Sequence, residues 1–301
     1  MFRHFFVIFR HFRHFSSFFF TFINLTSRHL QIKMSVYPPP DDVRIDELHP
    51  SVQSLFKKKQ WVQRTHEWYE VRKGLMTASD AAGALGIPPF KSFKGCPREE
   101  LLQKKLNNAP VQGMALEHGV KYETEAAEYA MKIIGGRMFE FGLLIHDEYP
   151  WLAASPDGIT ADGHAIEIKC PLRRKIIPGE VPHHYEAQIQ VQLEVCNLGA
   201  CWFIQYKPGF MNEDGEPFVD ITLVKRDREW FANNKDKLYS FWEELMSRRK
   251  THIPEKVESE VILLINDDLY DVPREEYVRE LEDTDDSLFQ EDEKCLITDM
   301  Y

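Results

Sequence analysis

The side chains best suited to chemistry are Glu167 and Lys169, in the alternating stretch 165–170, together with Asp157 upstream. A β-strand projects successive side chains to opposite faces, so Glu167 and Lys169 share one face of a predicted strand. The turn-forming residues 161–163 separate this strand from Asp157. A hairpin of this length brings the carboxylate of Asp157 beside that of Glu167.

Such a group suits metal-assisted hydrolysis of a phosphodiester. Two carboxylates and a main-chain carbonyl are the hard oxygen ligands that Mg²⁺ prefers, and Mn²⁺ is an alternative ion. An adjacent lysine can hold the attacking water or offset charge on the phosphate. The alternative is a surface hairpin with an ordinary Glu–Lys pair, which the pair alone would favour. The Asp-Gly step at 157–158 and the Cys-Pro step at 170–171 shift the balance toward a site.

A further carboxylate is expected from a helix predicted over residues 119–133. Glu123 and Glu125 both lie near its start, and spacing does not choose between them because helices carry many solvated glutamates. His118 could serve as a ligand, although a structural or exposed histidine is the more common case. This helix therefore adds candidate ligands without singling one out.

The helix predicted over residues 184–196 carries Gln188, Gln190 and Gln192. Gln188 and Gln192 share a helix face, while apolar side chains form a buried stripe on another. Glutamine amides could bond water, phosphate or a base edge. An ordinary polar face explains the spacing equally well, so both interpretations stay open.

The rest of the pattern predicts a mixed sheet flanked by helices, in the α/β or α+β class, over residues 43–250. Helices are predicted over residues 67–72, 97–106, 119–133, 184–196 and 228–249, and strands over residues 141–145, 151–155, 165–170, 200–206 and 219–224. A further small-residue helix follows Thr77, with Thr77 or Ser79 as its N-cap.

Two unusual ends flank this domain. Residues 1–42 comprise a Phe- and Arg-rich segment without acids, followed by a proline-rich linker, and residues 251–301 form an acidic tail. Residues 255–301 carry a net charge of −13 and residues 1–34 a net charge of +5, which leaves −3 of the total −11 for residues 35–254. Charge alone therefore neither supports nor excludes DNA binding by the central domain.

The composition favours an intracellular protein. Five cysteines lie scattered without a C-x-x-C pair, which argues against a disulfide framework, a zinc cage or an iron–sulfur cluster. Residues 1–34 are compatible with a mitochondrial presequence; if translation instead starts at Met34, a nuclear or cytoplasmic location is expected. The longest weakly polar run, residues 15–25, is too short to span a bilayer, so no stable membrane association is expected.

Taken in order, five groups of residues resemble the lambda exonuclease and YqaJ viral-recombinase family of PD-(D/E)XK nucleases. The resemblance covers about residues 61–245. It is carried by Trp68-Tyr69 with Arg72-Lys73-Gly74 and Thr77-Ala78-Ser79, then Gly119 with Tyr122-Glu123, then Ser155-Pro156-Asp157-Gly158, then Glu167-Ile168-Lys169-Cys170-Pro171, and finally Tyr185 with Gln188-Ile189-Gln190.

The resemblance implies a restriction-endonuclease-like fold and a role for each matching residue. Asp157, Glu167, the carbonyl of Ile168 and Glu123 would bind Mg²⁺, and Lys169 would position or activate the water. A terminal 5′-phosphate would be held by Arg72, Ser79 and Ser155, the arginine through paired hydrogen bonds. Gln188 would line the active site. Minor roles would fall to Asp147, Gln190 and Tyr185.

The activity implied is 5′→3′ exonuclease digestion of one strand of double-stranded DNA, in recombination, repair or viral genome processing. A single-strand annealing protein is the expected partner, and some members of the family form a homotrimer. The rival interpretations are an endonuclease with the same core, a catalytically silent DNA-binding recombination protein and a small-molecule metalloenzyme. The last has only the carboxylates in its favour.

Overall fold

The computed structural model describes residues 40–90, 93–108, 113–211 and 215–252. The Phe-rich segment and nearly all of the acidic tail, on which predictions were made above, lie outside these ranges. The described helices are α2 (Pro50–Phe56), α3 (His66–Lys73), α4 (Ala81–Ala84), α5 (Pro97–Leu106), α6 (Met114–Ile134), α7 (His183–Cys196) and α8 (Arg228–Arg249), with short 3₁₀ turns η1 (Ile45–Glu47) and η2 (Ala78–Asp80). The strands are β1 (Met76–Thr77), β2 (Met138–Phe139), β3 (Leu144–Ile145), β4 (Leu152–Ala154), β5 (Gly158–Thr160), β6 (His164–Lys169), β7 (Ala200–Met211) and β8 (Pro217–Lys225).

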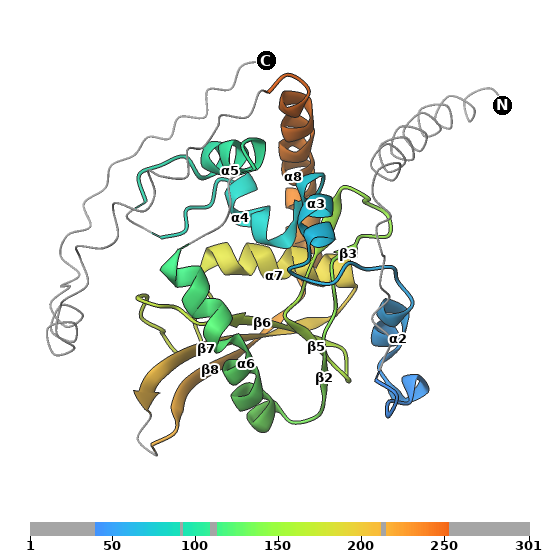
Figure 1. Cartoon of the computed structure of the whole chain (residues 1–301), viewed down its shortest axis with the longest axis vertical. Coiled ribbons are helices and arrows are strands. Elements are labelled where there is room, and N and C mark those ends of the chain that lie inside the picture. The colour runs from blue at the N-terminus through green and yellow to red at the C-terminus, as the bar shows by residue number, and fades with distance from the viewer. Residues whose placement is uncertain (1–39, 91–92, 109–112, 212–214, 253–301) are drawn as a thin grey trace, which may run out of the picture.

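The larger of two sheets has the strand order β2-β5-β6-β7-β8. Strands β6 and β7 are parallel, and the other neighbouring pairs are antiparallel. Because parallel strands cannot be joined by a tight turn, the chain crosses between β6 and β7 through α7 (Figure 1). The predicted mixed sheet flanked by helices is therefore confirmed.

Different helices cover the two faces of this sheet. On one face, Ala126 of α6 packs in a cluster with Ile166 and Ile168 of β6. Helix α7 lies over the opposite face (Figure 1), and there Gln188 of α7 reaches Glu167 of β6. The alternation predicted for β6 thus places its apolar residues under α6 and its functional candidates under α7.

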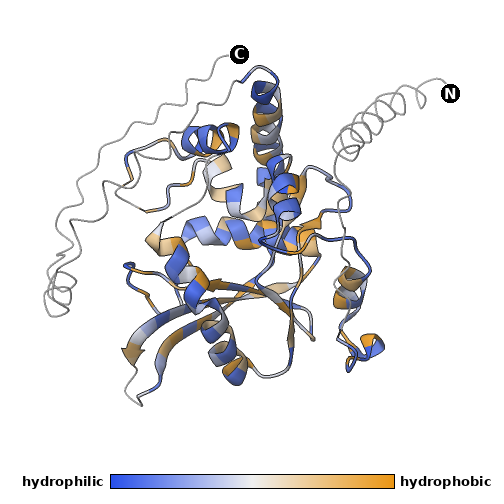
Figure 2. Cartoon of the chain, in the orientation of Figure 1, coloured by the Kyte–Doolittle hydropathy of each residue, from blue (hydrophilic) through white to orange (hydrophobic). Residues whose placement is uncertain are grey.

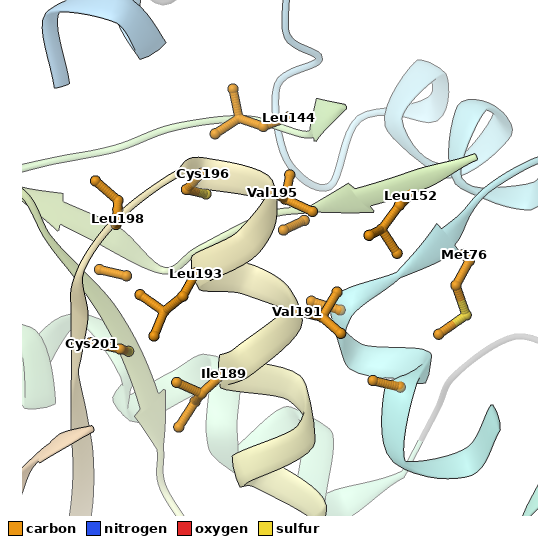
Figure 3. Packing of buried hydrophobic residues seen from close by; sticks show 14 of the residues in the cluster. Met76, Leu144, Leu152, Ile189, Val191, Leu193, Val195, Cys196, Leu198 and Cys201 are labelled. Carbon is orange, nitrogen blue, oxygen red and sulfur yellow. The ribbon is translucent and has the colours of Figure 1, made fainter. Parts of the chain in front are cut away.

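Helix α7 is buried along most of its length and forms the centre of the larger core (Figure 3). Its side chains, such as Val191, pack with Met76 and Leu152 of the second sheet, which has the order β1-β4-β3. The outer helices differ, since hydrophilic and hydrophobic residues recur in turn along α5 and α8 (Figure 2). Each of these two helices therefore buries only one side.

Of the two interpretations left open for the glutamines of α7, an ordinary polar face does not describe Gln190 and Gln192. Gln190 and Gln192 are 3% and 1% exposed. Gln190 donates to the carbonyl of Lys225 at 3.0 Å and accepts from the N–H of Asp227 at 2.7 Å, whereas Gln192 reaches the carbonyl of Ile166 at 3.4 Å. Buried amides are retained where main-chain groups satisfy them, so these two glutamines hold α7 to its neighbours.

Several predicted element boundaries shift in the structure. Helix α6 begins at Met114, five residues before the predicted start, and ends before Gly135, whose φ of 79° suits glycine. The strand predicted over residues 141–145 is reduced to its last two residues. The reason is that the N–H of Gly142 donates to Gln60 Oε1 at 2.7 Å and Leu143 bridges to Trp61, so this backbone is satisfied outside a ladder. Within the described residues, no helix has the length and apolarity needed to cross a bilayer.

Candidate active site

Asp157 lies between β4 and β5, directly beside β6. Its Oδ2 accepts the main-chain N–H of Ile168 at 2.7 Å, and its own N–H donates to the carbonyl of Ile166 at 3.2 Å. Because the N–H and C=O of one strand residue face the same neighbour, the Ile168 carbonyl leaves β6 on the side of Asp157. The turn at residues 161–163 thus brings Asp157 to β6, as the hairpin length predicts.

Glu167 occupies the centre of the group and is only 2% exposed. Its Oε1 receives Lys169 Nζ at 2.5 Å and Gln188 Nε2 at 2.6 Å. Its Oε2 is buried and has no hydrogen-bond partner among the residues that the structure describes. A buried carboxylate oxygen without a donor is costly, so this oxygen is suited to an external ligand.

The charges of the group are unbalanced. Burial, and then the negative charge of Glu167, raises the pKa of Asp157 well above its usual value. Burial alone would lower the pKa of Lys169, but the charges of Glu167 and Asp157 outweigh it and raise that pKa. Lys169 is therefore an ammonium that two carboxylates share, and a divalent cation would offset the remaining negative charge.

The donor set fits Mg²⁺, which commonly takes one or two carboxylates and completes its octahedron with water and substrate oxygens. Asp157, Glu167 and the carbonyl of Ile168 present such oxygens at one place. Within the described ranges, no three His, Cys, Asp or Glu side chains gather closely enough to hold a metal by themselves. A site here therefore depends on main-chain carbonyl and solvent oxygens as well as on carboxylates.

The structure separates the two glutamates of α6 that spacing left open. Glu123 forms an ion pair with Arg64 at 2.5 Å and lies near enough to Asp157 to contribute to its raised pKa. Glu125 instead accepts the hydroxyl of Tyr206. Glu123 is thus the glutamate beside the site, and its partner Arg64 was missed because nothing in the spacing links residues 64 and 123.

The three residues matched to a 5′-phosphate site converge around Trp68. The guanidinium of Arg72 stacks on the Trp68 ring, 4.1 Å from its centroid, and Arg72 Nη2 donates to Ser79 Oγ at 3.2 Å. Trp68 Nε1 donates to Ser155 Oγ at 3.0 Å. Burial lowers the pKa of Arg72, as expected for a guanidinium held partly out of water. The guanidinium fork of Arg72 and the two serine hydroxyls therefore form a small polar group around the Trp68 ring.

A buried ion pair between Asp80 and Lys105 holds the turn that carries Ser79. Asp80 accepts Thr77 N–H at 2.9 Å and Thr77 Oγ1 at 2.7 Å, which makes Thr77 rather than Ser79 the N-cap of the turn. Lys105 of α5 donates to Asp80 at 2.6 Å. Sequence reasoning missed both Asp80 and Lys105. The two residues lie far apart in the sequence, and they become partners only where α5 packs beside the turn that contains Asp80.

Comparison with protein families shows what kind of domain this is. Residues 67–198 match the YqaJ-like viral recombinase domain. Over this range, which is somewhat less than half of the chain, the protein is YqaJ-like. The matched range includes Arg72, Asp157, Glu167, Lys169 and Gln188.

The fold of this chain is similar to that of solved exonuclease structures. LHK-Exo in complex with dAMP aligns with a TM-score of 0.54 at 25% identity, covering 62% of this chain and 95% of that one. The alkaline exonuclease LHK-Exo from Laribacter hongkongensis aligns with a TM-score of 0.52 at 27% identity, with the same coverage. An uncharacterized protein of Acanthamoeba polyphaga mimivirus is 31% identical over 169 residues. That alignment covers 50% of this chain, which spans only 30% of the viral protein.

Three residues that the resemblance assigned to minor roles lie in different parts of the YqaJ-like domain. The ring of Tyr185 lies 4.9 Å from Lys169 Nζ, and so beside the catalytic candidates. Gln190 bonds main-chain groups of β8 and of the turn before α8, as described above. Asp147 is a largely exposed residue that pairs with Lys58 at 2.8 Å. Only Tyr185 of the three therefore touches the Glu167–Lys169 group.

Proposed function

We propose that this chain is a metal-dependent deoxyribonuclease that digests one strand of duplex DNA from a 5′ end. The observation that carries the proposal is the pairing of Glu167 with Lys169 and Gln188 through Oε1 while its buried Oε2 has no partner. A silent DNA-binding protein has no reason to bury this arrangement next to Asp157. A small-molecule metalloenzyme would use the carboxylates but has no need of the arginine and two serines gathered around Trp68. The two LHK-Exo structures, one of which is named an alkaline exonuclease, support the same class of reaction.

In the proposed mechanism, Asp157, Glu167 and the Ile168 carbonyl would hold Mg²⁺, with Glu123 as a nearby further acid. The bound ion would supply Lewis-acid polarisation of the phosphate and a more acidic water. Lys169 keeps its proton beside the two carboxylates, so it donates hydrogen bonds to the attacking water and to the phosphate oxygens that gain charge. Gln188 fixes Glu167 Oε1 and leaves Oε2 as the free ligand atom.

The 5′ polarity of the proposal rests on Arg72 and the two hydroxyls beside it. A terminal phosphate carries more charge than an internal phosphodiester and presents more oxygens to a guanidinium fork. Arg72 is already stacked and held by Ser79, so little side-chain entropy is lost on binding. A site of this kind favours strands that begin with a 5′-phosphate.

The proposal is tested with linear duplex DNA labelled at either the 5′ or the 3′ end, incubated with Mg²⁺ or with EDTA. The expected result is early release of the 5′ label as mononucleotide, only with Mg²⁺. A covalently closed circle is the matched substrate without ends and should remain intact. Cutting of the circle would establish an endonuclease instead, and no cutting of either substrate would refute the nuclease assignment.

A further inference from the structure

Basic side chains continue from the catalytic group toward the far end of β7. Gln205 is the register partner of Lys169, and Lys207 follows it by two residues, so all three lie on one face of the sheet. From the spacing of strands and residues, the Cα atoms of Lys169 and Lys207 are about 8 Å apart. Lys207 therefore lies one strand over and two residues on from the catalytic lysine.

Lys207 is a buried cation that has no counter-charge among the described residues. The residue is only 8% exposed. Its Nζ donates to the carbonyl of Arg174 at 3.4 Å and lies 4.8 Å from the ring of Phe210. In the part of the chain that the structure describes, Lys207 forms no ion pair with a carboxylate. Burial, and then the charge of Arg174, lowers its pKa. Keeping an ammonium out of water without a partner costs stability.

Other basic groups lie near Lys207, and Arg174 contacts it through its main-chain carbonyl. Arg174 is held by Gln205 Oε1 at 2.7 Å. On α6, His118 has its Nε2 buried without a hydrogen-bond partner. Burial, and then the charges of Lys121 and Lys207, lowers the pKa of His118. These four residues, Arg174, Lys207, His118 and Lys121, are called here the basic track.

The basic track is continuous with the active site. The guanidinium of Arg174 lies 5.7 Å from the centre of the Tyr185 ring, and Lys169 Nζ lies 4.9 Å from the same ring. Burial, and then the charges of Arg174 and Lys169, lowers the pKa of His184 to about 4. Positive charge therefore extends from the catalytic lysine past Tyr185 to the start of α6.

We propose that the basic track binds backbone phosphates of the nucleic-acid strand that occupies the active site. The proposal rests on the function proposed above, because the strand must pass the Glu167–Lys169 group. Two features point to an anion of this chemistry: a buried ammonium that pairs with no carboxylate of the described residues, and a buried imidazole nitrogen with no hydrogen-bond partner among them. A polymer of phosphates supplies charge at successive positions, as a track of four basic residues requires, and such contacts position a strand without reading its sequence.

The test measures binding of a fluorescent oligonucleotide duplex to the full chain in EDTA, which prevents cutting, between 50 and 200 mM salt. Each phosphate contact contributes about 0.9 to the slope of log K against log salt. Lys207→Gln is expected to reduce that slope by about one and to weaken binding about fivefold near 0.15 M salt. Lys207→Arg should keep the slope, and Lys237→Gln, an exposed lysine on α8, is the control that should leave it unchanged.

Thermal unfolding provides a readout that a purely structural lysine would not give. Without DNA, Lys207→Gln should melt at or above the temperature of the unmodified chain, because an unpaired buried charge has been removed. If Lys207→Gln lowers the melting temperature, the salt dependence of DNA binding is measured instead with Lys121→Gln, because Lys121 is exposed. An unchanged slope in both variants overturns the proposal. Inorganic phosphate alone tests for a simple anion site: if it raises the melting temperature as much as DNA does, the polymer assignment is wrong.

The outcomes separate this inference from the proposed function. A chain that binds DNA with a slope dependent on Lys207 but cuts nothing in Mg²⁺ would refute the nuclease assignment and support the track. If the chain digests duplex DNA but the slope of log K against log salt is unchanged in Lys207→Gln and Lys121→Gln, the nuclease assignment is supported and the basic track is refuted.

Discussion

The carboxylate of Asp157 accepts the main-chain N–H of Ile168 at 2.7 Å, which holds the acid that directly precedes β5 against the neighbouring strand β6. The hydrogen bond fixes one oxygen of Asp157, and the carboxylate lies near enough to Glu167 and Lys169 for the charges of both to act on its pKa. Ordering a carboxylate in advance lowers the entropy cost of binding a cation there. The same arrangement holds the carboxylates of Asp157 and Glu167 close together, and their repulsion lowers the stability of the metal-free protein. The site is thus ordered for cation binding at a cost in stability.

Because the two acids are proposed to bind the cation and also repel each other, Asp157→Asn should lower activity and raise stability. The amide oxygen still accepts the Ile168 N–H, but one of two adjacent buried negative charges is lost. Mg²⁺-dependent digestion of duplex DNA should be abolished, while the metal-free protein gains about 1 kcal/mol of stability, or roughly 2–4 °C in Tm. Asp236→Asn, at an exposed position of α8, is the control and should change neither quantity. An active Asp157→Asn variant would contradict the assignment of the site.

Metal binding should be visible without any substrate. A ligand that binds only the folded state stabilises it, by about 2.7 kcal/mol when its concentration is one hundred times Kd. Mg²⁺ should therefore raise the Tm of the unmodified chain at constant ionic strength, and Mn²⁺ should do the same. Asp157→Asn and Glu167→Gln should show no such rise. Equal shifts in all three proteins would place the ion elsewhere.

The role of Arg72 predicts a change in preference rather than a general loss of activity. Arg72→Lys keeps the charge but loses the fork that bonds Ser79 and the flat face that stacks on Trp68. The ratio of digestion rates for phosphorylated and hydroxyl 5′ ends should fall toward one, with the rate on hydroxyl ends nearly unchanged. Arg228→Ala, at an exposed position near the start of α8, should keep the full ratio. A preserved ratio in Arg72→Lys would remove the phosphate assignment.

Gln188 should act on turnover through Glu167. It donates to Glu167 Oε1 at 2.6 Å, and losing such a supporting hydrogen bond typically costs about 10–100-fold. Gln188→Leu should lower kcat by this order with little change in KM, because the residue orients a ligand rather than holding DNA. Gln188→Asn, with a shorter reach, should behave similarly. A rise in KM at constant kcat would instead indicate direct contact with the strand.

The central hairpin could be predicted from sequence because its determinants are local. Strand alternation fixes the faces of Glu167 and Ile168, and the turn at residues 161–163 fixes the distance to Asp157. The choice between Glu123 and Glu125 could not be made from spacing, since it depends on how α6 crosses the sheet. There Tyr206 engages Glu125 and leaves Glu123 toward Asp157.

The supporting contacts were hidden for a related reason. The burial of Gln190 is set by main-chain groups of Lys225 and Asp227, which lie more than thirty residues away in sequence. The lack of a counter-charge at Lys207 is likewise invisible in a sequence that is acidic overall. Such features depend on which groups tertiary packing leaves nearby, and no periodicity encodes them.

The Asp80–Lys105 ion pair predicts a specific dependence of stability on pH. Burial alone would raise the pKa of Asp80, but the charges of Lys105 and Arg72 outweigh it and lower that pKa below its usual value. A carboxyl whose folded-state pKa is depressed stabilises the fold above its unfolded pKa of about 3.9, and this contribution is lost as the pH falls through the folded pKa. Urea unfolding of the unmodified chain should therefore show the contribution of Asp80 in full at pH 6 and a decline only below about pH 4.

Lys105→Met should change both the size and the pH range of this effect. Removing one partner leaves a buried carboxylate uncompensated, which costs about 3–5 kcal/mol, and the pKa of Asp80 should rise. The loss of stability on acidification should then begin at a higher pH than in the unmodified chain. Lys105→Arg should restore most of the stability, and the double variant Asp80→Asn with Lys105→Met should be less destabilised than Lys105→Met alone. A Lys105→Met protein with an unaltered urea midpoint across this pH range would show that Asp80 is not held by Lys105 in solution.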